Sequence, residues 1–317
     1  MKRKIIKLGR STLVTTLPSK WAKNFNLKPG DELEIAERAN ELIISTFKNE
    51  NEILRKEINI ENFDTNLVKR AIIASYISGY EEIILRFKEQ KIERIKHFSA
   101  VSIFELVQNI VHTQLIGIEI IEQKSNSILL KAVSEINREE FNVMLRRIFL
   151  MLLSFGEELR HSINDFNKDA AKNAAANNDN IARFVNFLLR ILNKKGHEHF
   201  SKIPIYYYFV YKLREISYIY KFISEEFQIF KNKPVKEVVD VFNDINQSLH
   251  EFYNFYYTFS NEQGLNLLKK SREYYLKVNP MQYEKKQSSE TLLMISRLSV
   301  INVILLDLIE AKFSLEY

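Results

Sequence analysis

The sequence predicts an α+β protein that is mainly helical, in which a small N-terminal β domain precedes a large helical part. Three observations predict this fold class. The first 47 residues hold four short apolar or β-branched runs separated by turn residues. From residue 137 onwards the apolar residues recur at helical spacing. The chain of 317 residues contains only seven glycines and five prolines, which favours long helices.

The N-terminal β domain is predicted over residues 1–48. Its strands are expected at Arg3–Leu8, Thr12–Leu17, Glu32–Ala36 and Glu41–Ser45, with a turn at Gly9-Arg10-Ser11 and a short helix from Ser19, its expected cap, to Phe25. A domain of this size without a disulfide or a metal rarely builds a sufficient core alone. We therefore expect two copies to interleave their strands into one barrel. The apolar residues that such a barrel would bury are Leu13, Leu17, Trp21, Phe25, Leu27, Leu33, Ile35, Leu42 and Ile44.

The first 28 residues carry eight basic side chains and no acidic one, whereas the whole chain has 46 basic and 40 acidic residues. A local field of one sign on a strand-forming segment indicates a nucleic-acid interface. The alternative is a disordered basic tail, but Ile5, Ile6 and Leu8 make the segment too apolar for that. In a two-fold dimer the basic residues of both copies would share one face, which suits a pseudo-symmetric duplex.

The same segment contains the run LGRSTLVTTLPSKWAKNFNLKPGDELEI followed by ELIIS. Over residues 3–47 this order of parts resembles the SpoVT/AbrB-type swapped-hairpin DNA-binding domain of transition-state regulators and antitoxins. The resemblance implies DNA contacts from Arg3, Lys4, Arg10 and Lys23, while Ala22 stands where the family often has arginine. Charge alone adds Lys7 and Lys20. The predicted DNA-binding residues are therefore Arg3, Lys4, Lys7, Arg10, Lys20 and Lys23.

A linker is predicted over residues 49–62 and a second domain over residues 63–317. Residues 63–135 read as a mixed piece in which a small sheet packs on two helices. The helices are expected at Leu67–Ser78 and Ser99–Thr113, and the strands at Glu82–Phe87, Gly117–Glu122 and Ser127–Ala132.

Residues 137–317 read as an antiparallel helical bundle. Asn137 and Glu140 resemble a capping box at the start of its first helix. Further helices are expected at Lys168–Asn193, Pro204–Ile229, Val235–Phe259, Gly264–Val278 and Ser289–Leu315, with breaks at Gly196, at Lys233-Pro234 and around Pro280. The aromatic runs Tyr206–Phe209 and Tyr253–Phe259 fit core packing better than a platform for stacked bases, because their spacing is helical.

Three further stretches, YISGY, LVQNIVHTQLIGIEIIEQ and MLRRIFLMLLSFGEEL, are similar in their order to archaeal PhoU-type phosphate-uptake regulators, which carry an AbrB-like head on a PhoU-like bundle. This resemblance implies a role in phosphate uptake or homeostasis. Members often bind metal clusters through Glu-x-x-x-Asp pairs. The corresponding positions here hold Arg214 and Tyr218, Ser296 and Val300, and Asn178 and Ala182, so no metal is expected. A remaining acidic cluster of Glu158, His161 and Asp165 shares one helix face, and surface or capping roles suit it better.

We expect a transcriptional regulator that binds double-stranded DNA as a homodimer through its N-terminal domain. The helical part would sense a signal or dock a phosphate transporter component or a sensor kinase. The alternative is an adaptor that docks such a protein and does not bind DNA. An antitoxin would share the N-terminal domain, but antitoxins usually carry a short tail.

No catalytic function or cofactor is expected. The chain has no cysteine, and it shows neither an HExxH motif nor a glycine-rich phosphate loop. The apolar windows Ile148–Phe155 and Leu298–Ile309 are shorter than a membrane span, and no secretory signal is recognised. The expectation is a cytoplasmic protein without membrane insertion.

Overall fold

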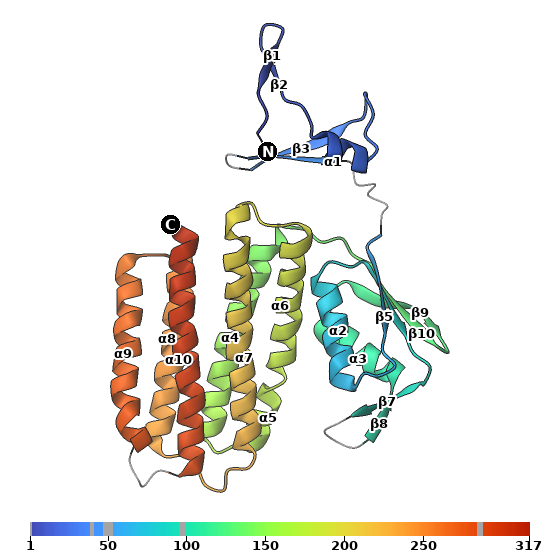
Figure 1. The fold of residues 1–317 in the computed structure, drawn as a ribbon. Coiled ribbons are helices and arrows are strands. Elements are labelled where there is room, and N and C mark those ends of the chain that lie inside the picture. The colour runs from blue at the N-terminus through green and yellow to red at the C-terminus, as the bar shows by residue number, and fades with distance from the viewer. Residues whose placement is uncertain (1, 39–40, 47–52, 95–98, 284–287) are drawn as a thin grey trace. The chain divides into compact units, whose positions relative to one another are not determined.

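The structure is a computed structural model that describes the chain except for residues 1, 39–40, 47–52, 95–98 and 284–287 (Figure 1). The chain divides into two compact units, Met1–Ile53 and Leu54–Tyr317, which we call the N-terminal and C-terminal units. Strands make up most of the regular structure in the first unit, and helices dominate the second. The predicted fold class, α+β and mainly α, is confirmed.

The N-terminal unit consists of two separate hairpins and one short helix. The hairpins are formed by β1 (Ile6–Leu8) with β2 (Thr12–Val14), and by β3 (Leu33–Arg38) with β4 (Glu41–Thr46); α1 (Ser19–Asn24) lies between them in the chain. Strands β1 and β2 are shorter than predicted. Ser19 does not cap α1, because extended Pro18 occupies the N-cap position and Ser19 is already helical. Within one copy of the chain, β1 therefore pairs only with β2, and β3 only with β4, among the described residues.

The C-terminal unit begins with a four-stranded sheet in the order β5-β6-β10-β9. Its strands are β5 (Arg55–Asn59), β6 (Glu82–Arg86), β10 (Ser127–Ala132) and β9 (Ile118–Lys124); β5 runs parallel to β6, and the other pairs are antiparallel. Helices α2 (Thr65–Ile77) and α3 (Ile103–Gln114) pack against this sheet (Figure 1). Residues 55–59 were predicted to belong to the linker. They form a strand because they pair with β6. Their polar sequence does not by itself indicate a strand.

A second correction concerns the segment before α3. We predicted a helix from Ser99, but β8 (Ser99–Ser102) pairs with β7 (Lys91–Arg94), which the sequence analysis did not predict. Ile92 stands opposite Val101 in this pair. The amide of Ile103 donates to the carbonyl of Gln90 at 2.9 Å, so the helix starts only at Ile103. Pairing between strands thus overrides the local helical spacing.

Seven α-helices follow the sheet among the described residues, and Figure 1 shows the long ones packed side by side. They are α4 (Glu140–Asn164), α5 (Lys168–Ala174), α6 (Asn177–Lys194), α7 (Ile203–Phe227), α8 (Lys236–Tyr257), α9 (Asn261–Tyr283) and α10 (Ser289–Glu316). A 3-10 turn, η1 (Phe200–Lys202), precedes α7. The Asn137–Glu140 capping box does not form, because Glu139 takes the N-cap position without a side-chain bond.

Two predicted helix boundaries in this bundle are wrong. The single helix expected over Lys168–Asn193 is broken between α5 and α6. The hydroxyl of Ser224 donates to the carbonyl of Ala171 at 2.7 Å, and the Lys168 ammonium donates to two carbonyls beyond the end of α7; both tie α5 to α7. At the other site α9 continues through Pro280, where a break was expected.

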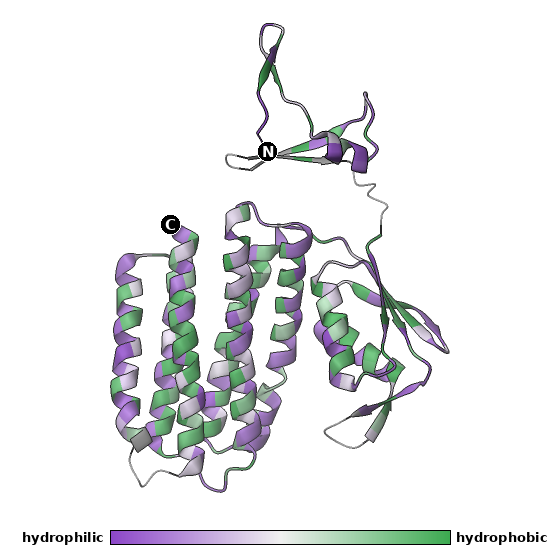
Figure 2. Cartoon of the chain, in the orientation of Figure 1, coloured by the Kyte–Doolittle hydropathy of each residue, from purple (hydrophilic) through white to green (hydrophobic). Residues whose placement is uncertain are grey.

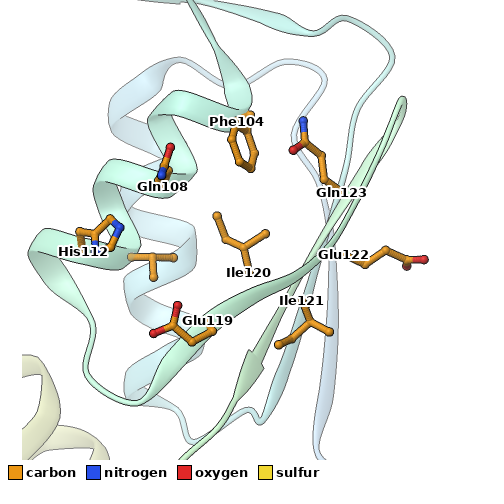
Figure 3. A pocket seen from close by; sticks show the side chains of 9 residues that line it. Phe104, Gln108, His112, Glu119, Ile120, Ile121, Glu122 and Gln123 are labelled. Carbon is orange, nitrogen blue, oxygen red and sulfur yellow. The ribbon is translucent and has the colours of Figure 1, made fainter.

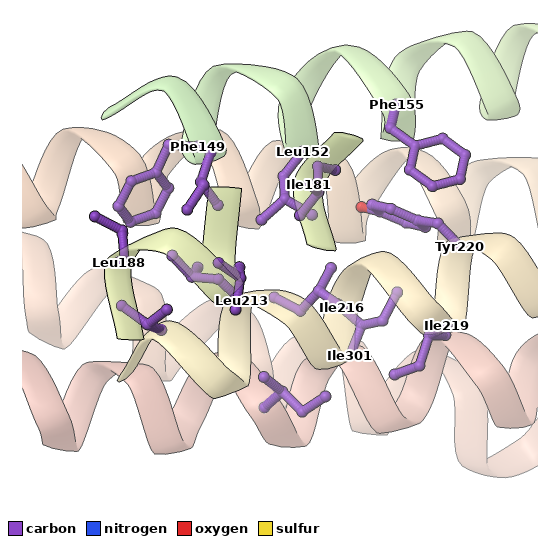
Figure 4. Close-up of a cluster of buried hydrophobic side chains, with 14 of the residues drawn as sticks. Phe149, Leu152, Phe155, Ile181, Leu188, Leu213, Ile216, Ile219, Tyr220 and Ile301 are labelled. Carbon is purple, nitrogen blue, oxygen red and sulfur yellow. The ribbon is translucent and has the colours of Figure 1, made fainter. Parts of the chain in front are cut away.

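The core of the bundle lies between α4, α6, α7, α8 and α10. Figure 4 shows Phe149, Leu152 and Phe155 of α4 facing apolar side chains of the neighbouring helices, and Figure 2 shows apolar residues along the facing sides. The Phe149 ring lies 6.0 Å from Phe209 and 5.3 Å from Tyr256. Both aromatic runs, Tyr206–Phe209 and Tyr253–Phe259, therefore contribute to the core, as their spacing predicted.

Helix α10 is long and apolar enough, by length and composition, to cross a membrane, and it is the one such helix among the described residues. Half of its most apolar window is buried inside the unit. It packs on α7, α8 and α9, and Asn302 donates a hydrogen bond to the Ser271 hydroxyl at 3.0 Å. These contacts are those of a core helix in a bundle.

Helix α6 joins the sheet region to the bundle through polar side chains on successive turns. Arg183 donates to the carbonyl of Leu115 at 2.7 Å and Asn186 to that of Gln114 at 3.0 Å, at the end of α3. Arg190 and Asn193 bind the carbonyls of Tyr76 and Ile77 at 2.5 and 2.8 Å, at the end of α2. These side chains bind carbonyls at helix ends, where intrahelical donors run out, although the Gly79 amide also donates to the Tyr76 carbonyl at 3.0 Å. The arginines complement the helix dipoles. We call this set the α6 seam.

Candidate nucleic-acid interface

The first basic group lies on the β1–β2 hairpin. Register pairs Ile6 with Val14, Lys7 with Leu13 and Leu8 with Thr12. Gly9 has φ +68°, a conformation that L side chains rarely adopt, and this lets the chain reverse within the turn that carries Arg10. Arg3 and Lys4 precede β1. Figure 1 shows the hairpin projecting from the rest of the N-terminal unit. Arg10 lies in the turn that joins β1 to β2.

The second basic group lies on α1. Lys20 and Lys23 are three residues apart and therefore lie on neighbouring positions of one helix face. Lys23 is in the last turn, where its charge complements the helix dipole. The Trp21 and Phe25 rings pack at 5.5 Å, and the amide of Leu27 donates to the carbonyl of Ala22 at 2.9 Å. These contacts hold a six-residue helix in place.

Five of the six charges in these two groups have no carboxylate partner among the described residues. The six predicted DNA-binding residues are all exposed. Within the part of the chain that the structure describes, Lys4, Lys7, Arg10, Lys20 and Lys23 form no ion pair with a carboxylate. Asp31, the first acidic residue of the chain, accepts a hydrogen bond from the backbone amide of Lys28 at 2.6 Å and so closes a turn. The basic field of the first 28 residues is therefore not neutralised locally.

The apolar side chains of the N-terminal unit are also exposed. None is buried among residues 2–35, 42, 44 and 46, and Leu13, Ile35 and Leu42 are each more than 60 % exposed. Of the residues predicted to fill a shared core, Phe25 is likewise exposed, while Leu17, Trp21, Leu27, Leu33 and Ile44 are half-buried. A soluble protein rarely leaves so much apolar surface uncovered unless it is an interaction surface.

The structure places the predicted site residues in two groups, four on or before the hairpin and two on α1. Residues 15–18 separate the groups along the chain. Lys2 and Lys28 are exposed as well, although the prediction assigned them no role. In the sequence, these two lysines stood out only because they lie in the acid-free stretch.

A different hollow, of about 330 Å³, lies between α3 and the edge strand β9 (Figure 3). Phe104 and Ile120 supply its apolar wall, and His112 and Glu119 lie beside it. A register shift interrupts the pairing of β9 with β10 between Leu129 and Leu130. A bulge and charged side chains are typical of an edge strand that resists pairing with another chain.

The acidic cluster considered from the sequence does not gather around one point. Glu158 accepts hydrogen bonds from Ser154 at 2.7 Å and from Asn177 at 3.1 Å, whereas Asp165 accepts from the neighbouring Asn164. Among the described residues there is no group of three His, Asp or Glu side chains placed to hold a metal ion.

Comparison with protein families matches residues 6–50 to the family described as "Antidote-toxin recognition MazE, bacterial antitoxin". The N-terminal unit carries a MazE/AbrB-like domain. The match ends near the boundary of the N-terminal unit. No curated protein and no solved structure matches the chain. The PhoU-type resemblance of the helical part stays a prediction.

Proposed function

We propose that the protein is a transcriptional regulator that binds double-stranded DNA as a homodimer through its N-terminal unit. MazE/AbrB-like domains commonly dimerise and bind DNA. The observation that carries the proposal is the combination found in this unit: side chains of both kinds, basic and apolar, are exposed together. Dimerisation buries the apolar ones, and the basic ones remain for the duplex.

The chemistry of binding follows from the two kinds of basic residue. The Arg10 guanidinium can form paired hydrogen bonds to a phosphate or to the edge of a guanine. Lysines act mainly as point charges on phosphates, so they fix position without reading sequence. Each neutralised phosphate adds about −0.9 to the slope of log affinity against log salt. We therefore expect binding that depends steeply on salt.

The finer part of the proposal concerns the C-terminal unit. We infer that it senses or docks a component of phosphate uptake, such as a transporter or a sensor kinase, in the cytoplasm and without catalytic activity. Its support is the PhoU-type resemblance of the helical part. An adaptor that uses the N-terminal unit only to dimerise is the alternative function.

Titration of the full chain with a fluorescent random duplex, followed by anisotropy at a series of salt concentrations, tests the proposal. We expect tight binding at low salt that weakens linearly on log–log axes, together with a dimer mass in sedimentation. Lys236→Ala, which removes an exposed charge from the C-terminal unit, is the matched control and should bind like the wild type. A dimer that binds no duplex even at the lowest salt would favour the adaptor.

A further inference from the structure

Helices α7 and α10 pack side by side and leave large apolar side chains exposed along their outward sides (Figure 1). Tyr208 and Phe222 of α7 are each 44 % exposed. Val300 and Val303 of α10 are 45 % and 46 % exposed. We call the surface formed by these four residues the α7–α10 face.

Two ion pairs join the helices at this face. Lys212 of α7 binds Asp307 of α10 at 3.0 Å. Arg297 of α10 binds Glu226 of α7 through two nitrogens, Nε at 3.1 Å and Nη2 at 2.5 Å. The outward sides of the two helices are therefore held together as one surface.

The exposed rings lie next to the cations of these ion pairs. The Lys212 ammonium is 5.4 Å from the centre of the Tyr208 ring, and the Arg297 guanidinium is 5.3 Å from that of Phe222. Cations at this distance from a ring face attract it and fix its position. The two aromatic side chains are thus preorganised without being covered.

The two valines lie between the ion pairs. Along α10, Arg297, Val300, Val303 and Asp307 follow one another at spacings of three, three and four residues, so they share one face of the helix. The α7–α10 face therefore has an apolar centre with paired charges at both ends. A protein interface is built in the same way, with an apolar core and a polar rim.

Helix α10 carries apolar residues on all its sides, yet half of its most apolar window is buried within one copy. A helix that is apolar all round is normally covered all round. The side that stays open is the one that bears Val300 and Val303. An exposed patch of this kind marks an interaction surface.

The charges beside the face argue against an anionic partner. Lys212 also binds Glu215 at 3.1 Å, so the two cations of the face, Lys212 and Arg297, meet three carboxylates. Anionic lipid and nucleic acid are attracted by an excess of positive charge, which this surface does not offer. A neutral, apolar protein surface fits it better.

The size of the face fits a second copy of the chain. Helix α7 has 25 residues and α10 has 28. Two such helices side by side present a surface about 37 Å long and about 20 Å wide. This is roughly 700 Å² per copy, and each partner of a standard interface contributes about 800 Å². Because a two-fold interface brings the same patch of both copies together, an apolar face whose charges are already paired suits its own copy.

We propose that the α7–α10 face is a self-association surface of the C-terminal unit, at which α10 packs across α10 of a second copy. Val300 and Val303 form its centre, and the two ion pairs lie at its rim. This surface lies outside the N-terminal unit, and the inference does not rest on the proposed function.

Crosslinking of the full chain tests the surface, because the chain contains no cysteine of its own. Val303→Cys places a single thiol in the face, and Val143→Cys places one at a 66 % exposed position of α4 as the matched control. With a short bismaleimide, we expect Val303→Cys to form a covalent dimer at least tenfold faster than Val143→Cys. Equal rates would overturn the proposal.

Sedimentation of full-chain variants separates this surface from the N-terminal one. Leu13→Asp, which should disrupt pairing of the N-terminal units, should still self-associate through the α7–α10 face. Adding Val303→Asp should weaken that association at least tenfold, whereas adding Val143→Asp should not. Circular dichroism should be unchanged, since both valines are exposed. A Leu13→Asp protein that is monomeric at every concentration would overturn this inference and leave the proposed function standing.

Flotation with vesicles of phosphatidylcholine and phosphatidylglycerol tests a membrane as the occupant. We expect the full chain to stay with the soluble fraction. Flotation of the wild type that is lost in Val303→Asp and kept in Val143→Asp would assign the face to a lipid surface and would overturn the proposal.

Discussion

The two units of this chain differ in where their apolar side chains lie. In the C-terminal unit, Phe149, Leu152 and Phe155 are fully buried among helices of the same copy. In the N-terminal unit none of residues 2–35, 42, 44 and 46 is buried, although many of them are apolar. The C-terminal unit closes its core within a single chain, whereas the N-terminal unit leaves apolar side chains exposed. In the proposed dimer these side chains would be covered by the second copy, and the stability of this unit would then depend on concentration.

The largest contrast should come from the units expressed separately. Residues 54–317 alone should unfold cooperatively at the midpoint of the full chain, since their core needs nothing from residues 1–53. Residues 1–53 alone should lose their fold on dilution, because in the proposed dimer the second copy covers the apolar side chains that one copy leaves exposed. Circular dichroism at a series of concentrations measures both. If residues 1–53 stayed folded as a monomer, this difference between the two units would be contradicted.

Truncation of a core side chain should separate the units by several kcal/mol. Phe155 is fully buried and its ring lies 5.4 Å from Tyr220, so Phe155→Ala should lower the free energy of unfolding by about 3–5 kcal/mol. Leu13→Ala, at an exposed position, should leave the unfolding of the C-terminal unit unchanged and weaken the dimer. Urea denaturation measures the first effect and sedimentation the second. Equal effects of both on the C-terminal transition would contradict the contrast.

A substitution in the α6 seam should have an intermediate effect on stability. Arg190→Met removes the guanidinium donor from the Tyr76 carbonyl, which keeps only the Gly79 amide at 3.0 Å as a donor among the described residues, and should cost about 1–3 kcal/mol. Hydrogen exchange should rise at the end of α2. Arg272→Met, which removes an exposed arginine from α9, is the control and should change neither quantity. An Arg190→Met protein as stable as this control would mean that the seam is dispensable.

Arg10 should affect function and not folding. Arg10→Ala should reduce affinity for duplex DNA about tenfold, since a good guanidinium contact contributes 1–3 kcal/mol. The melting temperature should stay the same, because Arg10 is exposed on a turn. Anisotropy and thermal denaturation on one preparation check both. Parallel losses of affinity and melting temperature would make Arg10 a structural residue.

The smallest effect concerns Glu82, a buried carboxylate at the start of β6. Hydrogen bonds from Arg55, at 2.6 and 2.8 Å, and then from Lys131 lower the pKa of Glu82. A lowered pKa in the folded state stabilises the protein above the ordinary carboxyl pKa, and this contribution is lost as pH falls through the lowered value. Glu82→Gln should therefore flatten the acid limb of the stability curve. An unchanged acid limb in urea titrations would assign the pH dependence to other groups.

The sequence predicted the fold class, most of the bundle helices and the bounds of the strand at Ser127–Ala132. These elements are encoded by strong local periodicity. It missed the strands at Arg55–Asn59 and Lys91–Arg94, which are short, polar and ordered by their partners. It also placed breaks wrongly, because the local effect of a proline or an alanine-rich run depends on what packs against it.

For the candidate site, the sequence sufficed to name the six basic residues and their exposure is seen in the structure, but their DNA contacts stay predictions. The α6 seam had no sequence signal, because Arg183 and Arg190 lie far along the chain from the carbonyls of Leu115 and Tyr76 that they bind. Charge along a segment is visible in one dimension. Charge gathered by packing is visible only once helices have been placed side by side.

The sequence by itself determined the local features of this protein: an acid-free basic stretch with strand pattern, and long amphipathic helices after it. These depend on neighbours within a few residues, for which spacing and composition are sufficient. The tertiary structure decided which apolar faces are covered within one copy, where α6 ties the sheet to the bundle, and which side chains bind the carbonyls at the ends of α2 and α3. Those outcomes depend on contacts between distant segments, whose free energy no local pattern contains.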